Sequence, residues 1–153
     1  MPVRVAIALG SNLGDRRGLL EQAVSALRPF VTALRVSPFY ETDPVGTGPQ
    51  PAYLNAAVTG RVEVSARALL DRLLAIEAAA GRTRPHPGAA RTLDLDLILY
   101  GRDVIDEPGL QVPHPRFRER EFVLRPLADV APDLVDPVTG VTVGELLERR
   151  IAG

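Results

Sequence analysis

LDLDLILY, residues 93–100, alternates apolar and acidic side chains before it ends in a short apolar run. Successive side chains of a β-strand point to opposite faces of a sheet, so this alternation predicts a strand. The leucines of the alternating part are expected to face the core, while Asp94 and Asp96 share the other face. That shared face makes the two aspartates the strongest candidates for chemistry in the chain.

The segments around this strand predict the rest of the fold. Strands are expected at 3–9, 34–40 and 53–62, and helices up to about residues 27 and 80, the first capped by Asp15 and the second by Ser65. A hairpin at 101–112, a segment at 113–127 and a last helix from about Val143 follow. The order βαββαβ predicts an α+β fold with a ferredoxin-like core, in which helices pack on an antiparallel sheet, plus C-terminal additions.

Length and composition favour one globular domain. The chain has 153 residues, of which 46% are hydrophobic and 24% charged, so we expect residues 1–153 to form a single domain that needs no metal or disulfide to fold. No apolar run approaches the roughly 18 residues of a membrane span, and the start of the chain lacks the cleavage pattern of a signal peptide. We therefore expect a cytoplasmic protein with no membrane partner.

Arginine supplies all 18 basic residues, because the chain contains no lysine, and it contains no cysteine either. Without lysine the chain cannot contain a Walker A loop, the strand lysine of a protein kinase or a lysine that forms a Schiff base. Without cysteine it cannot contain a thiolate nucleophile or a cysteine zinc site. With 19 acidic residues the net charge is −1, which argues against nucleic acid as the main partner. Phosphate chemistry would have to use arginine, metal and backbone.

The two aspartates directly follow an arginine-rich loop. Like charges this close repel each other, and a Mg²⁺ ion held by carboxylates and substrate phosphates relieves the repulsion. Arg82, Arg84 and Arg91 precede Asp94 and Asp96 in a stretch without acidic residues, and guanidinium groups suit phosphate oxygens. A solvated strand face is the alternative for the aspartates alone, but the adjoining basic loop favours a metal–polyphosphate site.

Glu77 lies near the end of the second predicted helix. It follows Leu70, Leu73 and Leu74 at helical spacing, so it is expected on their apolar face. A carboxylate there meets the unfavourable end of the helix dipole, so we expect an arginine partner from the loop that follows. The alternative is an exposed residue at a frayed helix end.

Aromatic and amide side chains form a further group of candidates. Tyr53 and Phe122 could stack on a flat heterocycle, although burial in the core is the common alternative. Asn55 shares a strand face with Tyr53 and can both donate and accept hydrogen bonds. A second basic cluster lies at 114–120, where three arginines accompany a histidine. The two histidines of the chain are too far apart in sequence to have the spacing of a metal site.

Taken in order, these segments resemble one known family. The motifs are Gly10-Ser11-Asn12, Tyr40-x-Thr42-x-Pro44-x-Gly46, Tyr53-Leu54-Asn55-Ala56-Ala57, Glu77, Arg82-x-Arg84, Arg91-Thr92-Leu93-Asp94-Leu95-Asp96, Pro113-His114-Pro115, Arg120 and Phe122-Val123-Leu124-Arg125-Pro126-Leu127. Together they resemble the 6-hydroxymethyl-7,8-dihydropterin pyrophosphokinases of folate biosynthesis, over nearly the whole chain from Val3 to about Leu134. The run that ends at Asp96, followed by the Pro-His-Pro motif, is the most specific part.

The resemblance implies transfer of the β,γ-diphosphate of ATP to the pterin hydroxymethyl oxygen, with release of AMP. We expect the protein to be a monomer. The resemblance also implies two Mg²⁺ ions on Asp94 and Asp96, with Arg82 and Arg91 covering the transferring group. The implied ATP contacts are Glu77, Arg84, Leu97, His114 and Arg120. The pterin is implied to lie between Tyr53 and Phe122, near Thr42, Val45 and Asn55.

One departure from the family pattern falls in the loop before the aspartates. The family often has Trp-Gly-Pro there, whereas this chain has Pro87-Gly88-Ala89-Ala90 and is one residue shorter. We expect a less tightly closed loop and an unchanged type of reaction.

A module that binds nucleotide or RNA on its sheet, without catalysis, is the alternative from another class. An RNA-recognition domain normally presents several strand aromatics and a basic balance. This chain has one clear strand aromatic and a net charge of −1. A binding module also gives no reason for two carboxylates on one strand face.

Overall fold

The computed structural model describes residues 1–12, 14–42, 52–81 and 93–153. In chain order the elements are β1 (Val3–Ser11), α1 (Arg16–Leu27), β2 (Thr32–Val36), β3 (Tyr40–Thr42), β4 (Tyr53–Val62), α2 (Ala66–Ala79), β5 (Asp94–Tyr100), β6 (Ile105–Glu107), β7 (Leu110–Val112), the 3₁₀ turn η1 (Phe117–Glu119), α3 (Glu121–Val130) and α4 (Val143–Ala152). None of the helices in these ranges has the length and apolar character needed to cross a bilayer.

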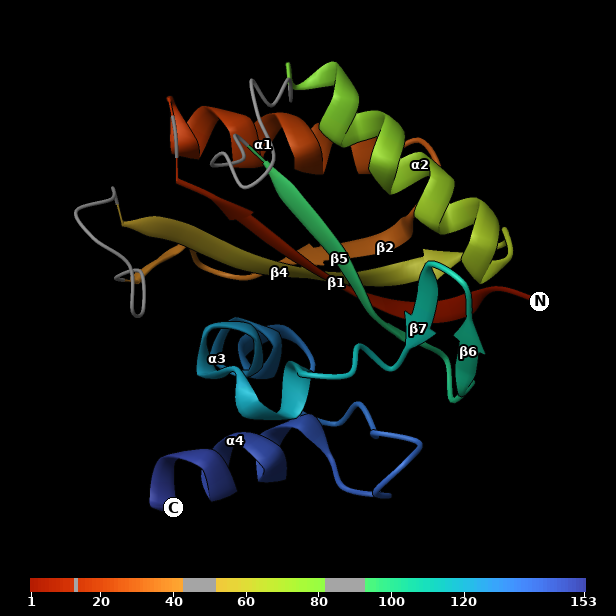
Figure 1. Cartoon of the computed structure of the whole chain (residues 1–153), viewed down its shortest axis with the longest axis vertical. Helices are drawn as coiled ribbons and strands as arrows, with labels where there is room; N and C mark the ends of the chain where they lie inside the picture. The colour runs from red at the N-terminus through yellow and green to blue at the C-terminus, as the bar shows by residue number, and fades with distance from the viewer. Residues whose placement is uncertain (13, 43–51, 82–92) are drawn as a thin grey trace.

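The central sheet is antiparallel, with the strand order β2-β4-β1-β5 and with β3 also paired to β4. Helices α1 and α2 cover one face of the sheet, and α3 and α4 lie on the opposite side (Figure 1). Strands β6 and β7 form a separate hairpin, where the sequence predicted one. This arrangement confirms the predicted α+β, ferredoxin-like fold with C-terminal additions.

Two apolar clusters hold the layers together, one on each face of the sheet. The cluster on the α1/α2 side contains Leu20 and Leu27 of α1, Leu69 and Leu73 of α2, and Leu93, Leu95 and Leu97. The cluster on the other side joins α3 and α4 to small strand residues such as Ala6 and Ala57. The predicted division of the β5 region into a core face and an acidic face is confirmed.

The first helix layer begins at the predicted caps. The Asp15 carboxylate accepts from the Gly18 N–H at 3.1 Å, and the Ser65 hydroxyl accepts from the Ala68 N–H at 3.1 Å. Each cap satisfies a backbone donor that the first helical turn leaves without a partner.

The apolar stripe of α2 differs from the predicted one. Leu69, Leu73 and Glu77 are buried at four-residue spacing, whereas Leu74 is 49% exposed. Each helical residue is rotated by about 100° from the one before, so Leu74 cannot share the centre of the buried face with Leu73. The prediction of Leu74 on the inner face was wrong.

The predicted strand at 34–40 is interrupted, and forms the separate strands β2 and β3. Between them the Ser37 N–H donates to the Ala57 carbonyl at 2.9 Å, and the Ala57 N–H donates to the Ser37 hydroxyl at 2.9 Å. The hydroxyl thus replaces a main-chain carbonyl in the ladder, and Pro38 lacks the N–H that would continue it.

Candidate functional site

A cavity of about 1010 Å³ opens beside the start of β5, on the side of the sheet where α3 lies. Its strand residues are Ala8, Leu9, Gly10, Thr42, Tyr53, Asn55, Asp94 and Asp96. On the other side it is bordered by Arg116, by residues 119–123, and by Arg150 and Gly153 at the end of α4. The fold therefore brings both aspartates, the Asn55 amide and both candidate aromatics to one cavity.

Small residues on β1 leave room next to the aspartates. Gly10 pairs with Asn55 on β4 and with Asp94 on β5, and Ala8 pairs with Asp96. A Cβ atom built at Gly10 would lie 3.3 Å from the Asn55 Oδ1 atom. Glycine at this position therefore lets the Asn55 amide lie close to the β1 backbone.

Asp94 and Asp96 are half-buried, whereas Leu95 between them is 5% exposed on the opposite face. Among the residues that the structure describes, no group of three or more His, Cys, Asp or Glu side chains is placed to hold a metal. Two carboxylates nevertheless fit Mg²⁺, which takes one or two protein carboxylates and fills its remaining positions with phosphate oxygens and water.

A second hollow, of about 670 Å³, adjoins Asp96. It is bordered by Leu70, Leu95, Leu97, His114, Pro115 and residues 106–111 around the β6–β7 hairpin. Among the described residues, Asp96 alone lines both this hollow and the larger cavity. Asp96 is thus placed where two ligands, one in each hollow, would meet.

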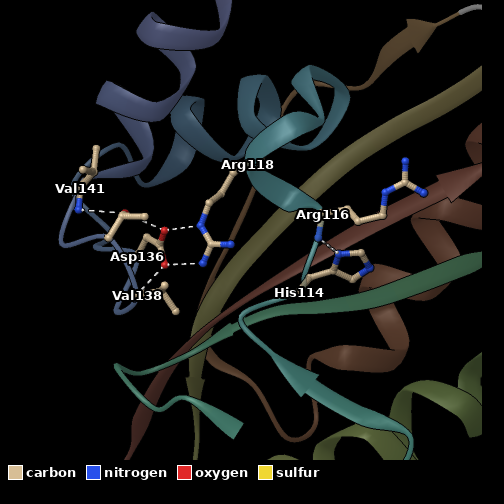
Figure 2. Close-up of polar contacts among 7 residues, drawn as sticks. His114, Arg116, Arg118, Asp136, Val138 and Val141 are labelled. Atoms are coloured by element: carbon tan, nitrogen blue, oxygen red, sulfur yellow. Dashed lines mark hydrogen bonds and ion pairs between the residues drawn. The ribbon is translucent and has the colours of Figure 1, made fainter. Parts of the chain in front are cut away.

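The His114 ring is held in one protonation form beside Asp96. Burial is the main cause that lowers the pKa of His114; Arg120 and Arg116 lower it further, while Asp96 opposes them. The His114 Nδ1 atom accepts from the Arg116 N–H at 3.2 Å (Figure 2). At neutral pH the ring is therefore uncharged, with its proton on Nε2, where it can donate to an anionic ligand.

Glu77 is 3% exposed, which confirms its predicted place on the buried face of α2 and excludes the alternative of an exposed residue at a frayed helix end. Its Oε2 atom accepts from the Leu95 N–H at 2.7 Å. Because β5 is an edge strand, the carboxylate supplies an acceptor that a neighbouring strand would otherwise provide. Glu77 thus fixes the part of β5 that carries the two aspartates. Its predicted arginine partners lie outside the described residues.

Three residues of the predicted pterin group come from adjacent strands. Thr42 on β3 pairs with Tyr53 on β4, and the Asn55 side-chain N–H donates to the Thr42 hydroxyl at 2.6 Å. Phe122 enters from α3 and is 42% exposed, with the Arg120 guanidinium 5.5 Å from its ring centre. The exposed Phe122 ring is available to a flat ligand, whereas burial in the core was its alternative.

Several predicted site residues lie outside the described part of the chain. These are Val45, Arg82, Arg84 and Arg91, together with the shortened stretch at 87–90. Their roles stay predictions.

The second basic cluster divides into two groups. Arg116 and Arg120 border the larger cavity, whereas Arg118 pairs with the buried Asp136 at 2.5 Å and 2.8 Å (Figure 2). Charge alone placed these arginines in one cluster, only the family resemblance gave Arg120 a role, and Asp136 was not singled out. The turn residues that follow Asp136 are the only local signal, since the pairing joins residues 18 positions apart.

Comparison with known proteins decides the family. A family profile described as 7,8-dihydro-6-hydroxymethylpterin-pyrophosphokinase (HPPK) matches residues 6–132. The chain belongs to this family. The profile includes every described residue predicted here for the site, and it ends before Asp136.

Relatives from bacteria agree with this membership. The 2-amino-4-hydroxy-6-hydroxymethyldihydropteridine pyrophosphokinase of Synechocystis is 43% identical over 145 residues, covering 94% of this chain and 74% of that protein. The protein of the same name from Bacillus subtilis is 48% identical over 126 residues, covering 81% of this chain and 75% of that protein.

Solved structures of the HPPK family support the fold. The Plasmodium falciparum HPPK-DHPS structure aligns with a TM-score of 0.79 at 13% identity, covering 99% of this chain. This chain spans 45% of that one, so the match concerns the fold of a part of the larger protein.

Proposed function

We propose that the chain transfers the β,γ-diphosphate of ATP to the hydroxymethyl group of 6-hydroxymethyl-7,8-dihydropterin, giving AMP and the pterin diphosphate in folate biosynthesis. Its family and the names of its relatives support this activity. The observation that carries it is the position of Asp96, which borders both hollows. A group transferred between a ligand in one hollow and a ligand in the other would therefore pass close to the Asp96 carboxylate.

The larger cavity suits the pterin. Tyr53 and Phe122 border it from β4 and α3, and aromatic rings of this kind stack on flat heterocycles. The Asn55 amide, which its bond to Thr42 orients, can read the donor and acceptor pattern of the ring edge. We propose Val45 as a further pterin contact from the neighbouring loop.

The second hollow suits ATP. His114 and Leu97 border this hollow, and Arg120 lies on the side of the larger cavity. Because the His114 Nδ1 atom accepts a hydrogen bond, its Nε2 atom would be the donor to a phosphate oxygen. We propose that Arg84 adds a further phosphate contact and that Glu77 belongs to this side of the site. Its bond to the Leu95 N–H keeps the strand between the two aspartates in place.

Asp94 and Asp96 would hold Mg²⁺, and we propose two ions, as the family resemblance implies. Bound Mg²⁺ would neutralise phosphate charge and lower the pKa of the attacking hydroxyl. Diphosphate transfer otherwise depends on alignment and on charge stabilisation. We propose that Arg82 and Arg91 supply positive charge over the transferring group and exclude water, which would otherwise compete with the pterin hydroxyl.

We further propose that residues 1–153 act as one domain and as a monomer, in the cytoplasm, where ATP is available. Thr42, Tyr53, Asn55, Asp94, Asp96, Arg120 and Phe122 all line the larger cavity of one chain, so the site does not need a second copy.

The test is an incubation with ATP, 6-hydroxymethyl-7,8-dihydropterin and Mg²⁺, with separation of the nucleotides. We expect AMP and pterin diphosphate in equal amounts, and neither product when pterin or Mg²⁺ is left out. ADP as the product would indicate transfer of a single phosphoryl group. Nucleotide binding without any product would favour the non-catalytic binding module.

A further inference from the structure

Asp136 is a buried carboxylate at the turn between α3 and α4, outside both hollows. Its side chain is inaccessible to solvent. It accepts two hydrogen bonds from Arg118, at 2.5 Å from Nε and 2.8 Å from Nη2, one from the Val138 N–H at 3.0 Å and one from the Thr139 hydroxyl at 2.7 Å (Figure 2). A buried carboxylate is costly unless its oxygens are fully paired, and here both are.

The turn that contains Asp136 is closed on itself. The Asp136 N–H donates to the Val141 carbonyl at 2.9 Å, and the Gly140 N–H donates to the Asp136 carbonyl at 2.8 Å. Burial opposes the charged form of Asp136, but hydrogen bonds from Arg118, Thr139 and Val138 outweigh it and lower the pKa of this carboxyl. The turn therefore holds the Asp136 carboxylate in its charged form and in a fixed position. Arg118, from the segment before α3, binds to this carboxylate.

Arg118 lies in the short segment that carries site residues. His114 precedes it by four positions, and Arg120 and Phe122 follow it by two and four. The 3₁₀ turn η1 has three residues, and its N-terminal end has no side-chain cap. Turns this short are poorly stabilised by their own hydrogen bonds, so their orientation depends on contacts with other parts of the fold.

We propose that Asp136 is a positioning residue for the transfer reaction: through Arg118 it fixes η1, and so sets how His114, Arg120 and Phe122 enter the two hollows. This inference rests on the proposed function. The two-pronged pairing suits the task because it restricts both the place and the orientation of the guanidinium group.

The chain offers a matched control for this pair. Asp133, three positions before Asp136, pairs with Arg4 in the same two-pronged way, at 2.8 Å and 3.3 Å. That pair is exposed, with 69% of the Asp133 side chain accessible, and neither residue borders a hollow. It holds the same segment to β1 without contacting η1.

The experiment compares Asp136→Asn with Asp133→Asn. Thermal unfolding gives the folded fraction, and kcat and KM for both substrates are measured per folded enzyme. We expect Asp136→Asn to lower kcat/KM by about 10²-fold, the loss typical of reacting groups displaced by about 1 Å, while Asp133→Asn stays within about twofold of wild type. Asp136→Glu, which keeps the charge, should recover part of the loss.

A kcat/KM for folded Asp136→Asn equal to that of Asp133→Asn would overturn the proposal and leave a purely stabilising role. If Asp136→Asn does not fold, Arg118→Lys replaces it in the comparison with Asp133→Asn. Lysine keeps the positive charge but cannot make the two-pronged pair of the guanidinium group. Calorimetric titration with Mg·ATP separates this inference from the proposed function. Weaker ATP binding by Asp136→Asn than by Asp133→Asn supports the positioning role even if the wild type releases no AMP, in which case the proposed function fails.

Discussion

The two faces of the central sheet use the same strands in different ways. On the α1/α2 side, large residues such as Ile7, Leu9 and Leu95 fill the space between sheet and helices. On the other side, Ala6, Ala57 and their neighbours meet α3, and near the start of β5 the strands leave the larger cavity open. The site is therefore the part of the second face where small and polar strand residues leave the core unfilled.

Alternation along each strand explains how both faces arise from one sequence. On β1, Ala8 and Gly10 face the cavity side while Leu9 packs in the opposite core. On β5, Asp96 borders the cavity while Leu95 belongs to that same core. Substitutions at adjacent positions should therefore affect different properties, activity on one face and stability on the other.

The strongest test of this separation is Asp96→Asn, with Asp94→Asn as its partner. Removing a metal-binding charge should cost several kcal/mol of transition-state stabilisation, so we expect AMP formation to fall by about 10³-fold or more, since each 1.36 kcal/mol is a factor of ten. The unfolding temperature should hardly change, because both carboxylates are only half-buried.

Asp103→Asn is the control, since this aspartate follows the same strand but is exposed and borders neither hollow. Its activity should match the wild type. Full turnover by both Asp94→Asn and Asp96→Asn would remove the metal assignment.

The opposite face is tested by Leu73→Ala on α2. Leu73 is fully buried in the cluster on the α1/α2 side and borders neither hollow, and truncation of a buried leucine costs about 3 kcal/mol through lost burial and the cavity left behind. Chemical denaturation should show this loss, while kcat per folded enzyme stays within a small factor of wild type. Leu74→Ala on α2, where the leucine is 49% exposed, should change the free energy of unfolding by less than about 0.5 kcal/mol. Equal losses in the free energy of unfolding for the two variants would mean that burial does not decide how much each leucine stabilises the fold.

Local sequence patterns predicted the part of the molecule that depends on neighbours along the chain. The alternation at 93–100 revealed both the strand and its acidic face, and the caps at Asp15 and Ser65 located two helix starts. The candidate site could be assembled because its residues lie at the ends of these elements, which the fold then brings together.

Contacts between distant segments could not be predicted in the same way. The bond from the Leu95 N–H to Glu77 and the pair of Arg118 with Asp136 each join residues 18 positions apart. Which leucines of α2 face the sheet likewise depends on how the helix lies on it, and this is why Leu74 was misplaced. Periodicity gives the width of an apolar stripe but not its centre.

The smallest expected effect comes from Gly10→Ala, which tests whether the open face depends on close backbone approach. The new methyl group would lie 3.3 Å from the Asn55 Oδ1 atom, so the amide must move by a few tenths of an ångström and its 2.6 Å bond from Nδ2 to Thr42 must adjust. We expect the KM for the pterin to rise by about fivefold, which corresponds to about 1 kcal/mol, with the KM for ATP unchanged. Because the effect passes through the Asn55 amide, the same substitution in an Asn55→Ala background should change the pterin KM much less, as expected for residues in contact. Additive losses in the double variant would show instead that Gly10 acts on the cavity by a route independent of Asn55.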